Sequence, residues 1–183
     1  MENIFLDRKN EAFFEKNGYV KLKVLSDKAV EYLSKIYVKY EKEHLKISTR
    51  FHSTSDTSNK SLIQNVNLEV KEILLSETSG LFHPIKSLIA NFMIKEPGKN
   101  SEVAAHQDWT FVNEEKGFSG NLWAGLHDIN HKNGCMFFLP GSHNITKSLR
   151  VSPSYKAFYE SLRFEIPKYA KYEPTKKGEG FLI

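Results

Sequence analysis

The sequence predicts an α+β fold, mainly β in its core, in which helices come first and short strands follow. Two stretches with apolar residues at helical spacing lie before residue 80. Short apolar stretches separated by turn signals lie after it. Aromatic residues make up 13% of the 183 residues, and such residues favour strands. We therefore expect one domain, residues 1–183, that is helical over 1–80 and built from strands over about 81–183.

The N-terminal part is expected to contain a short helix, a strand and a long helix. Glu11–Lys16 is amphipathic and is soon followed by Gly18, a residue type that often ends helices. Tyr19–Leu25 alternates polar and apolar residues, which indicates a strand. Ser26 is then a suitable N-cap for a helix over Asp27–His44, whose apolar residues share one face.

A loop, a second long helix and several strands are expected next. Ser53–Asn59 is polar and rich in turn-forming residues, which indicates the loop. Apolar spacing then predicts a helix over about Leu62–Leu75. The expected strands are Ser87–Lys95, Asn121–Ile129, Gly134–Leu139 and one that begins at Gly180–Ile183.

Composition argues against several classes of partner. The net charge is +4, but lysines are scattered among acidic residues and do not alternate with aromatics, so we expect no nucleic-acid partner. No apolar run approaches the ~20 residues of a membrane helix, and no signal peptide follows Met1. The single cysteine, Cys135, excludes an intramolecular disulfide, and this fits a reducing, cytoplasmic location.

The sequence His106–Gln107–Asp108 carries the clearest chemical signal. On extended backbone, residues i and i+2 project from the same side, so one imidazole and one carboxylate converge on one point. A histidine and a carboxylate are two corners of the facial triad that holds iron(II) in oxygenases. The pattern is short, however, and alone it also fits a hydrogen-bonded pair on the surface.

The context of this motif resembles the phytanoyl-CoA dioxygenase family. After the His-Gln-Asp sequence come a strand that contains Trp123, the turn Asn133–Gly134, and an apolar strand ending in Pro140–Gly141–Ser142–His143. The order and the spacing of these elements match the family over about Phe92–His143. The segment Phe13–Val20 is also similar to the family's N-terminal start.

The resemblance implies a double-stranded β-helix, a jelly-roll or cupin-like barrel preceded by helices. It implies that His106 and Asp108 bind iron(II) and act in catalysis. It implies that 2-oxoglutarate chelates the iron near Trp123, with Asn91 touching this co-substrate. We therefore expect an Fe(II)- and 2-oxoglutarate-dependent dioxygenase that uses O2 to hydroxylate a small organic substrate. Hydroxylation is favoured over halogenation because halogenating relatives replace the carboxylate with a small residue.

The resemblance also places a second His and an Arg beyond Gly178–Ile183, so the barrel is expected to be incomplete at the C-terminus of this chain. We expect the 183-residue chain to bind iron(II) weakly and not to turn over 2-oxoglutarate. We also expect an exposed strand edge at Gly180–Ile183. Substrate contacts are expected from the loop Trp109–Ser119.

Two alternatives stay open at this stage. The chain is a non-catalytic binding module of the same fold, or it is a cupin-like metalloenzyme that takes a third ligand from His127 or His143. Three residues also have simpler roles to consider. His143 is expected to be structural because it lies in a turn, Trp123 is a core residue if the family match is set aside, and Cys135 suits a small buried position.

Overall fold

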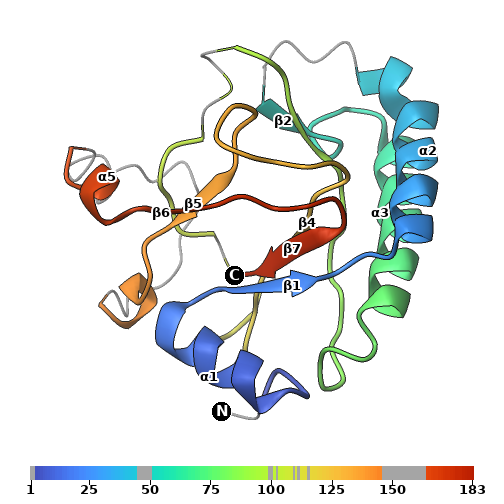
Figure 1. The fold of residues 1–183 in the computed structure, drawn as a ribbon. Helices are drawn as coiled ribbons and strands as arrows, with labels where there is room; N and C mark the ends of the chain where they lie inside the picture. The colour runs from blue at the N-terminus through green and yellow to red at the C-terminus, as the bar shows by residue number, and fades with distance from the viewer. Residues whose placement is uncertain are drawn as a thin grey trace. The chain divides into compact units, whose positions relative to one another are not determined.

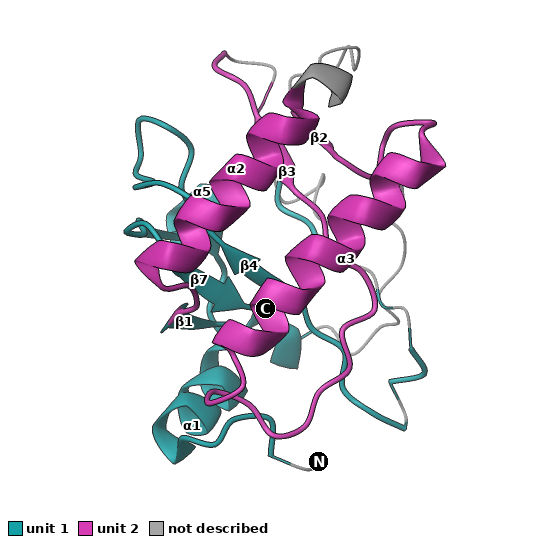
Figure 2. Cartoon of the chain, turned by 90° about the vertical axis from the view of Figure 1, so that its right-hand side faces the viewer, with its two compact units in different colours: residues 1–22, 104–183 teal, residues 23–103 magenta. Residues whose placement is uncertain are grey.

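Three helices alternate with short strands in the first part of the chain, and mostly short strands follow (Figure 1). The computed structural model describes residues 3–44, 51–98, 101, 103–108, 110, 112–114, 116–145 and 164–183. The chain divides into two compact units, unit 1 with residues 1–22 and 104–183 and unit 2 with residues 23–103 (Figure 2). Unit 1 therefore combines both ends of the chain, whereas unit 2 is continuous.

Unit 2 is built on two long helices, α2 (Asp27–His44) and α3 (Lys60–Glu77), which pack against each other. Each helix begins after a residue that caps it. The Ser26 hydroxyl accepts a hydrogen bond from the first turn of α2, and the Asn59 side chain does the same for α3. Apolar residues of both helices are buried at Ala29, Val30, Leu33, Ile36, Tyr40, Leu62, Val66 and Val70. Both expected helices are thus confirmed.

A two-stranded sheet completes unit 2, in which β2 (Phe51–Ser53) pairs antiparallel with β3 (Met93–Lys95). Of the strand expected over Ser87–Lys95, only β3 is a strand. The backbone before it is satisfied in another way, because the N–H groups of Ala90 and Phe92 donate to side chains of α3 and of the loop after β2. Side-chain acceptors therefore replace a neighbouring strand along this segment.

Unit 1 begins with α1 (Arg8–Asn17) and β1 (Val20–Lys23), at the positions expected from the sequence. Gly18 ends α1 in the left-handed region, with a φ of +78°, and its N–H donates to the Phe14 carbonyl at 2.7 Å. A residue without a side chain is favoured at this conformation, which explains why the helix ends at this glycine.

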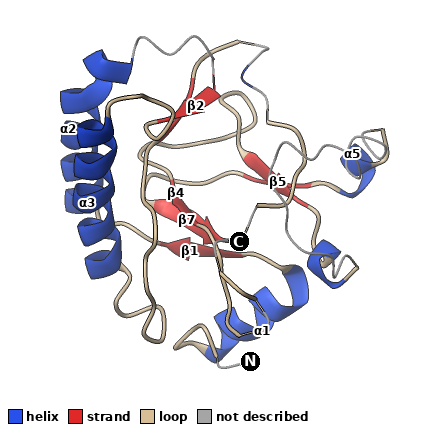
Figure 3. Cartoon of the chain, turned by 180° about the vertical axis from the view of Figure 1, so that it is seen from behind, coloured by secondary structure: helices blue, strands red, loops and turns tan. Residues whose placement is uncertain are grey.

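The larger sheet of unit 1 has three strands in the order β1-β7-β4 (Figure 3). Its middle strand β7 (Glu179–Leu182) pairs antiparallel with β4 (Leu122–Ala124). A Cβ added to Gly180 would lie 1.9 Å from the Trp123 carbonyl oxygen, so only glycine permits this close pairing. The expectation of an exposed edge at Gly180–Ile183 is therefore wrong, because β7 has a neighbouring strand on each side.

A second sheet of unit 1 pairs β5 (Met136–Phe138) with β6 (Lys171–Glu173) in the antiparallel sense. The short helices η2 (Ser142–Asn144) and α5 (Ile166–Tyr169) also belong to this unit. Neither β6 nor α5 is predicted by the sequence patterns, because each is only one turn or three residues long. The strand expected over Asn121–Ile129 is regular only in β4, with one further bridge from Ile129.

The core of unit 1 is aromatic. Phe181 in β7 is fully buried and lies opposite Trp123 of β4. Tyr19 stacks on Phe138, with ring centroids 4.0 Å apart, and both rings also contact Phe181. These contacts join α1–β1 at one end of the chain to β5 and β7 near the other.

The described residues therefore form a mixed helix and strand architecture with three small sheets. The expected α+β class is confirmed. Within those residues no sheet closes into a barrel, so the jelly roll and the single-domain organisation stay predictions. Among the same residues, no helix combines the length and the apolar character that crossing a membrane requires.

Candidate metal-binding site

The side chains of His106 and Asp108 meet in unit 1. Both residues lie on an irregular segment that comes before β4 in the chain. The His106 Nε2 atom is 3.1 Å from the Asp108 Oδ1 atom, so the two side chains face each other as the i, i+2 spacing predicts. The contact between His106 and Asp108 therefore follows from the local backbone. The orientation of the two side chains depends on further partners in unit 1.

The orientation of the His106 ring is fixed by a backbone carbonyl. Its Nδ1 atom lies 2.8 Å from the Ala104 oxygen, and because a carbonyl can only accept, Nδ1 carries the hydrogen. Nε2 is then the nitrogen that faces the carboxylate and can hold either a proton or a metal ion. A backbone or carboxylate partner on the second ring nitrogen is the usual arrangement around metal-binding histidines.

The hydrogen bond to Asp108 raises the pKa of His106 above its ordinary value of 6.5. Burial opposes this shift, while the Ala104 carbonyl and the negative charge of Asp108 add to it. The His106 ring in this pair therefore holds a proton on Nε2 more readily than a free imidazole does. A metal ion that binds at Nε2 has to displace that proton.

The second oxygen of Asp108 has its own partner. The Asn121 side-chain amide donates to Oδ2 at 2.7 Å. Asn121 directly precedes β4, and its backbone N–H and carbonyl each pair with Ile183 at 3.0 Å. The β4–β7 pairing thus extends by one residue, and it fixes the position from which the amide reaches Asp108.

The distance between the two ligand atoms fits one metal ion. Two ligands at ~2.1 Å from an ion and at a right angle lie ~3.0 Å apart. The observed separation of 3.1 Å between His106 Nε2 and Asp108 Oδ1 is close to this value. The imidazole and carboxylate donors also suit iron(II) and its neighbours among the transition metals.

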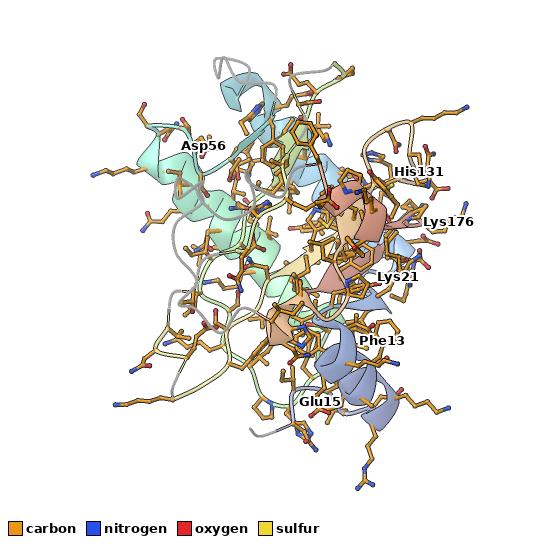
Figure 4. The ribbon with its side chains drawn as sticks, turned by 90° about the vertical axis from the view of Figure 1, so that its left-hand side faces the viewer. Phe13, Glu15, Lys21, Asp56, His131 and Lys176 are labelled. Carbon is orange, nitrogen blue, oxygen red and sulfur yellow. The ribbon has the colours of Figure 1, made fainter. Side chains whose placement is uncertain are left out.

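No group of three His, Cys, Asp or Glu side chains within the described residues is placed to hold a metal ion. The alternative in which His127 or His143 completes a cupin-like site therefore lacks support. His143 instead donates from Nε2 to the Glu15 carbonyl at 3.0 Å, which is the structural role expected for it. Glu15 lies on α1 and is labelled in Figure 4.

Trp123 is half-buried in β4, and its ring lies against Phe181 with centroids 6.0 Å apart. It shares strand parity with Asn121, so the two side chains project from the same face of the sheet. Its packing agrees with the simpler reading of Trp123 as a core residue. The expected contact with 2-oxoglutarate stays a prediction.

Asn91 belongs to unit 2, where its amide donates to the Ser55 hydroxyl at 3.3 Å. Its expected contact with the co-substrate also stays a prediction. Trp109, the first residue of the expected substrate loop, lies outside the described residues, as do Phe111 and Glu115.

Two groups that orient the pair, the Asn121 amide and the Ala104 carbonyl, were not predicted from the sequence. A signal for Asn121 was present, because it opens the expected strand and has the parity of Trp123. The Ala104 carbonyl belongs to the backbone, so its residue type gives no signal.

Comparison with known proteins extends these observations. Residues 14–178 match the family described as phytanoyl-CoA dioxygenase (PhyH). The chain is 33% identical to phytanoyl-CoA dioxygenase domain-containing protein 1 of Danio rerio over 111 residues, which are 56% of this chain and 38% of that protein. It is 40% identical to phytanoyl-CoA dioxygenase 1 of Oryza sativa subsp. japonica over 52 residues, 28% of this chain and 18% of that protein. The chain thus matches less than two-fifths of the length of these relatives. No solved structure is significantly similar to it.

Proposed function

Because the chain belongs to the phytanoyl-CoA dioxygenase family, we propose that it supplies two iron ligands of an Fe(II)- and 2-oxoglutarate-dependent dioxygenase. Its substrate is a small organic molecule, and the reaction is a hydroxylation. The observation that carries the proposal is the 3.1 Å contact between His106 Nε2 and Asp108 Oδ1. The family match supports oxygenase chemistry, and the donor atoms suit a transition metal.

In this proposal the chain's own residues prepare the ligand atoms. Ala104 holds the His106 hydrogen on Nδ1, which leaves Nε2 for the metal. The Asn121 amide donates to Oδ2 of Asp108, while Oδ1 faces His106 Nε2 and would bind the same ion. When bound, iron with 2-oxoglutarate and O2 supplies the oxidising chemistry. A metal ion bound at Nε2 would displace the proton held there.

Trp123 and Asn91 are the proposed contacts of 2-oxoglutarate. The half-buried indole of Trp123 offers an apolar wall on the sheet face that it shares with Asn121. The amide of Asn91 offers both a donor and an acceptor to a carboxylate-bearing ligand. The carboxylate of Asp108 leaves no ligand position for a halide, which favours hydroxylation.

Metal binding by the purified chain tests the proposal. We expect Co²⁺, which stands next to Fe²⁺ in the affinity series and resists oxidation, to bind in a manner that depends on the pair. His106→Ala and Asp108→Ala should each weaken binding by more than about tenfold, since loss of outer partners alone costs about that much. His127→Ala, which removes an exposed histidine of the same unit, should leave the affinity unchanged.

The same titration, repeated with 2-oxoglutarate and Fe²⁺ without oxygen, tests the co-substrate. A chelating co-substrate should tighten retention of iron in the chain but not in His106→Ala. If His106→Ala and Asp108→Ala bind Co²⁺ as the unchanged chain does, the metal site is wrong. If binding depends on the pair but 2-oxoglutarate has no effect, the site stands and the 2-oxoglutarate dependence is contradicted.

A further inference from the structure

The ring of Phe118, in the segment before β4, lies against α1. It is edge-on to the ring of Phe14, with centroids 5.6 Å apart and the ring planes at 89°. Phe14 is buried on α1 and also packs on Phe5, with centroids 5.6 Å apart. Edge-to-face aromatic pairs attract each other beyond the effect of the area that they bury. Phe118 thus joins the segment before β4 to a buried part of α1.

The same ring lies close to the backbone just before β4. A Cβ added to Gly120 would lie 2.8 Å from Cε1 and Cζ of Phe118 and 2.9 Å from the Ile183 carbonyl oxygen. The ring therefore takes the space that a side chain at residue 120 would need. Because Gly120 has no side chain, the chain can turn Phe118 back over its own backbone and toward Phe14.

The segment fastened in this way connects two residues of the candidate site. The loop expected to contact substrate, Trp109–Ser119, follows Asp108 directly and ends two residues before Asn121. The Asn121 amide donates to Asp108 at 2.7 Å, so the two ends of this connection are neighbours. Residues 116–118 are exposed. The contact with Phe14 therefore holds a stretch of chain that otherwise lies at the surface.

We propose that Phe118 is a positioning residue that holds residues 116–120 on α1 and thereby keeps the connection between Asp108 and Asn121 in place beside the candidate metal pair. The inference rests on the proposed function of that pair. When the ring is removed, residues 116–120 leave α1 more often, as a local opening of the fold. Because these residues lead to both ends of the connection, a metal ion held by the pair is then released faster.

Trypsin cleavage after Lys116 tests this anchor without a metal. A protease acts on opened chain, so the cleavage rate reports how often the segment opens. In Phe118→Ala we expect cleavage to be faster by about two- to tenfold, the range that corresponds to the loss of one aromatic pair. Cleavage after Lys132, in an exposed turn of the same unit, should keep its rate. Phe118→Tyr retains the ring and should cleave nearly as slowly as the unchanged chain.

Phe13→Ala is the matched control. Phe13 and Phe118 have the same exposed fraction, 41%, but Phe13 makes its edge contact with Tyr19. This variant should leave the ratio of the two cleavage rates unchanged. Phe14→Leu gives the complementary test, because leucine keeps an apolar side chain but not the ring. Adding Phe118→Ala to Phe14→Leu should accelerate cleavage less than Phe118→Ala does alone.

The second measurement is the rate at which a chelator removes Co²⁺ from the chain. Phe118→Ala should speed this release by a factor similar to that for trypsin cleavage, because both follow from the same opening. Phe13→Ala should leave the rate of release unchanged.

Several outcomes would overturn the inference. Unchanged cleavage after Lys116 in Phe118→Ala means that the ring does not anchor the segment. Equal acceleration at Lys116 and Lys132 means that the ring only stabilises unit 1 as a whole. Faster cleavage with unchanged Co²⁺ release means that the segment opens without an effect on the site. If His106→Ala does not weaken Co²⁺ binding, the proposed metal site fails, and this result is distinct because trypsin cleavage does not depend on a metal.

Discussion

At the His106–Asp108 pair, a metal ion bound as proposed would compete with a proton for Nε2 of His106. The Ala104 carbonyl holds one ring hydrogen on Nδ1, so the competition concerns Nε2, which faces Asp108 Oδ1 at 3.1 Å. The hydrogen bond to Asp108 raises the pKa of His106 and thereby strengthens the proton's position. Metal affinity should consequently increase as the pH rises through this raised pKa.

Titration of the His106 ring in the metal-free chain checks this reasoning. We expect a midpoint above the ordinary 6.5 and a lower midpoint in Asp108→Asn, because the variant loses the charge and weakens the hydrogen bond. Since the folded-state pKa is the raised one, the pair stabilises the fold at pH values below about 6.5, and this stabilisation is lost as the pH rises through the folded pKa. Proton NMR of the ring hydrogens measures the midpoints; equal midpoints in the chain and the variant would contradict the assigned cause.

At this scale, the sequence identified the two candidate ligands but not the groups that orient them. The i, i+2 spacing is a local property, and it is enough to bring His106 and Asp108 together. Asn121 reaches Asp108 from 13 residues away, through the pairing of β4 with β7. That pairing is a property of the folded sheet, so no local pattern reveals it.

The C-terminal end of α1 is hydrogen-bonded to a turn that lies more than 120 residues later in the sequence. The last carbonyls of a helix lack partners within the helix. At the end of α1, Gly141 N–H donates to the Asn17 carbonyl at 3.0 Å, and His143 Nε2 donates to the Glu15 carbonyl at the same distance. The turn at residues 140–143 therefore caps α1, which links the family-like start of the chain to its Pro-Gly-Ser-His sequence.

Gly18→Ala should destabilise unit 1. A Cβ at this position would lie 2.4 Å from His143 Nδ1, and the φ of +78° disfavours any residue with a side chain. We expect a loss of about 1–3 kcal/mol in the free energy of unfolding, measured by urea denaturation. Gly117→Ala is the matched control, because a Cβ there meets nothing within 4 Å, and it should cost much less.

A double variant separates the two causes of that loss. In His143→Ala the clash is removed, so adding Gly18→Ala should then cost only the conformational part, about 1–2 kcal/mol. Full additivity of the two substitutions would show that His143 and Gly18 do not interact in solution.

The helices were more predictable than the strands for a physical reason. The caps Ser26 and Asn59 and the helical spacing that follows them lie within one short segment each. The strands are only three or four residues long and take their regular form from distant partners. For example, β6 is recognisable only through its pairing with β5, and the central place of β7 follows from its pairing with β1, far away in the sequence, and with β4.

In unit 1, strands from near the two ends of the chain are neighbours in one sheet. In Figure 1 the blue strand β1 runs beside the red strand β7, which in turn pairs with β4. The Tyr19 hydroxyl donates to Glu173 at 2.9 Å, across a separation of 154 residues. The strand β4, which carries Trp123 and directly follows Asn121, thus belongs to a sheet that includes residues from the start of the chain.

Substitutions of Tyr19 measure how much these contacts between the two ends of the chain contribute to the free energy of unfolding. The ring is 2% exposed and packs on Phe138 and Phe181, so Tyr19→Ala should cost about 3–5 kcal/mol of unfolding free energy. Tyr19→Phe keeps the ring contacts and loses only the hydrogen bond to Glu173, for about 1–2 kcal/mol at neutral pH. Urea unfolding of the chain and both variants provides the values.

The pH dependence of the same comparison tests whether the pKa of the Tyr19 hydroxyl is raised in the folded chain. Burial, followed by the hydrogen bond to Glu173, raises the pKa of Tyr19 above its ordinary 10.0. The fold therefore favours the neutral phenol, and the stability that this provides is present below about pH 10 and is lost as the pH rises through the raised pKa. Phenylalanine does not ionise, so the advantage of the unchanged chain over Tyr19→Phe should shrink as the pH rises from about 10 through the raised pKa. If the difference stays constant over this range, the pKa of the Tyr19 hydroxyl is not raised in the folded chain.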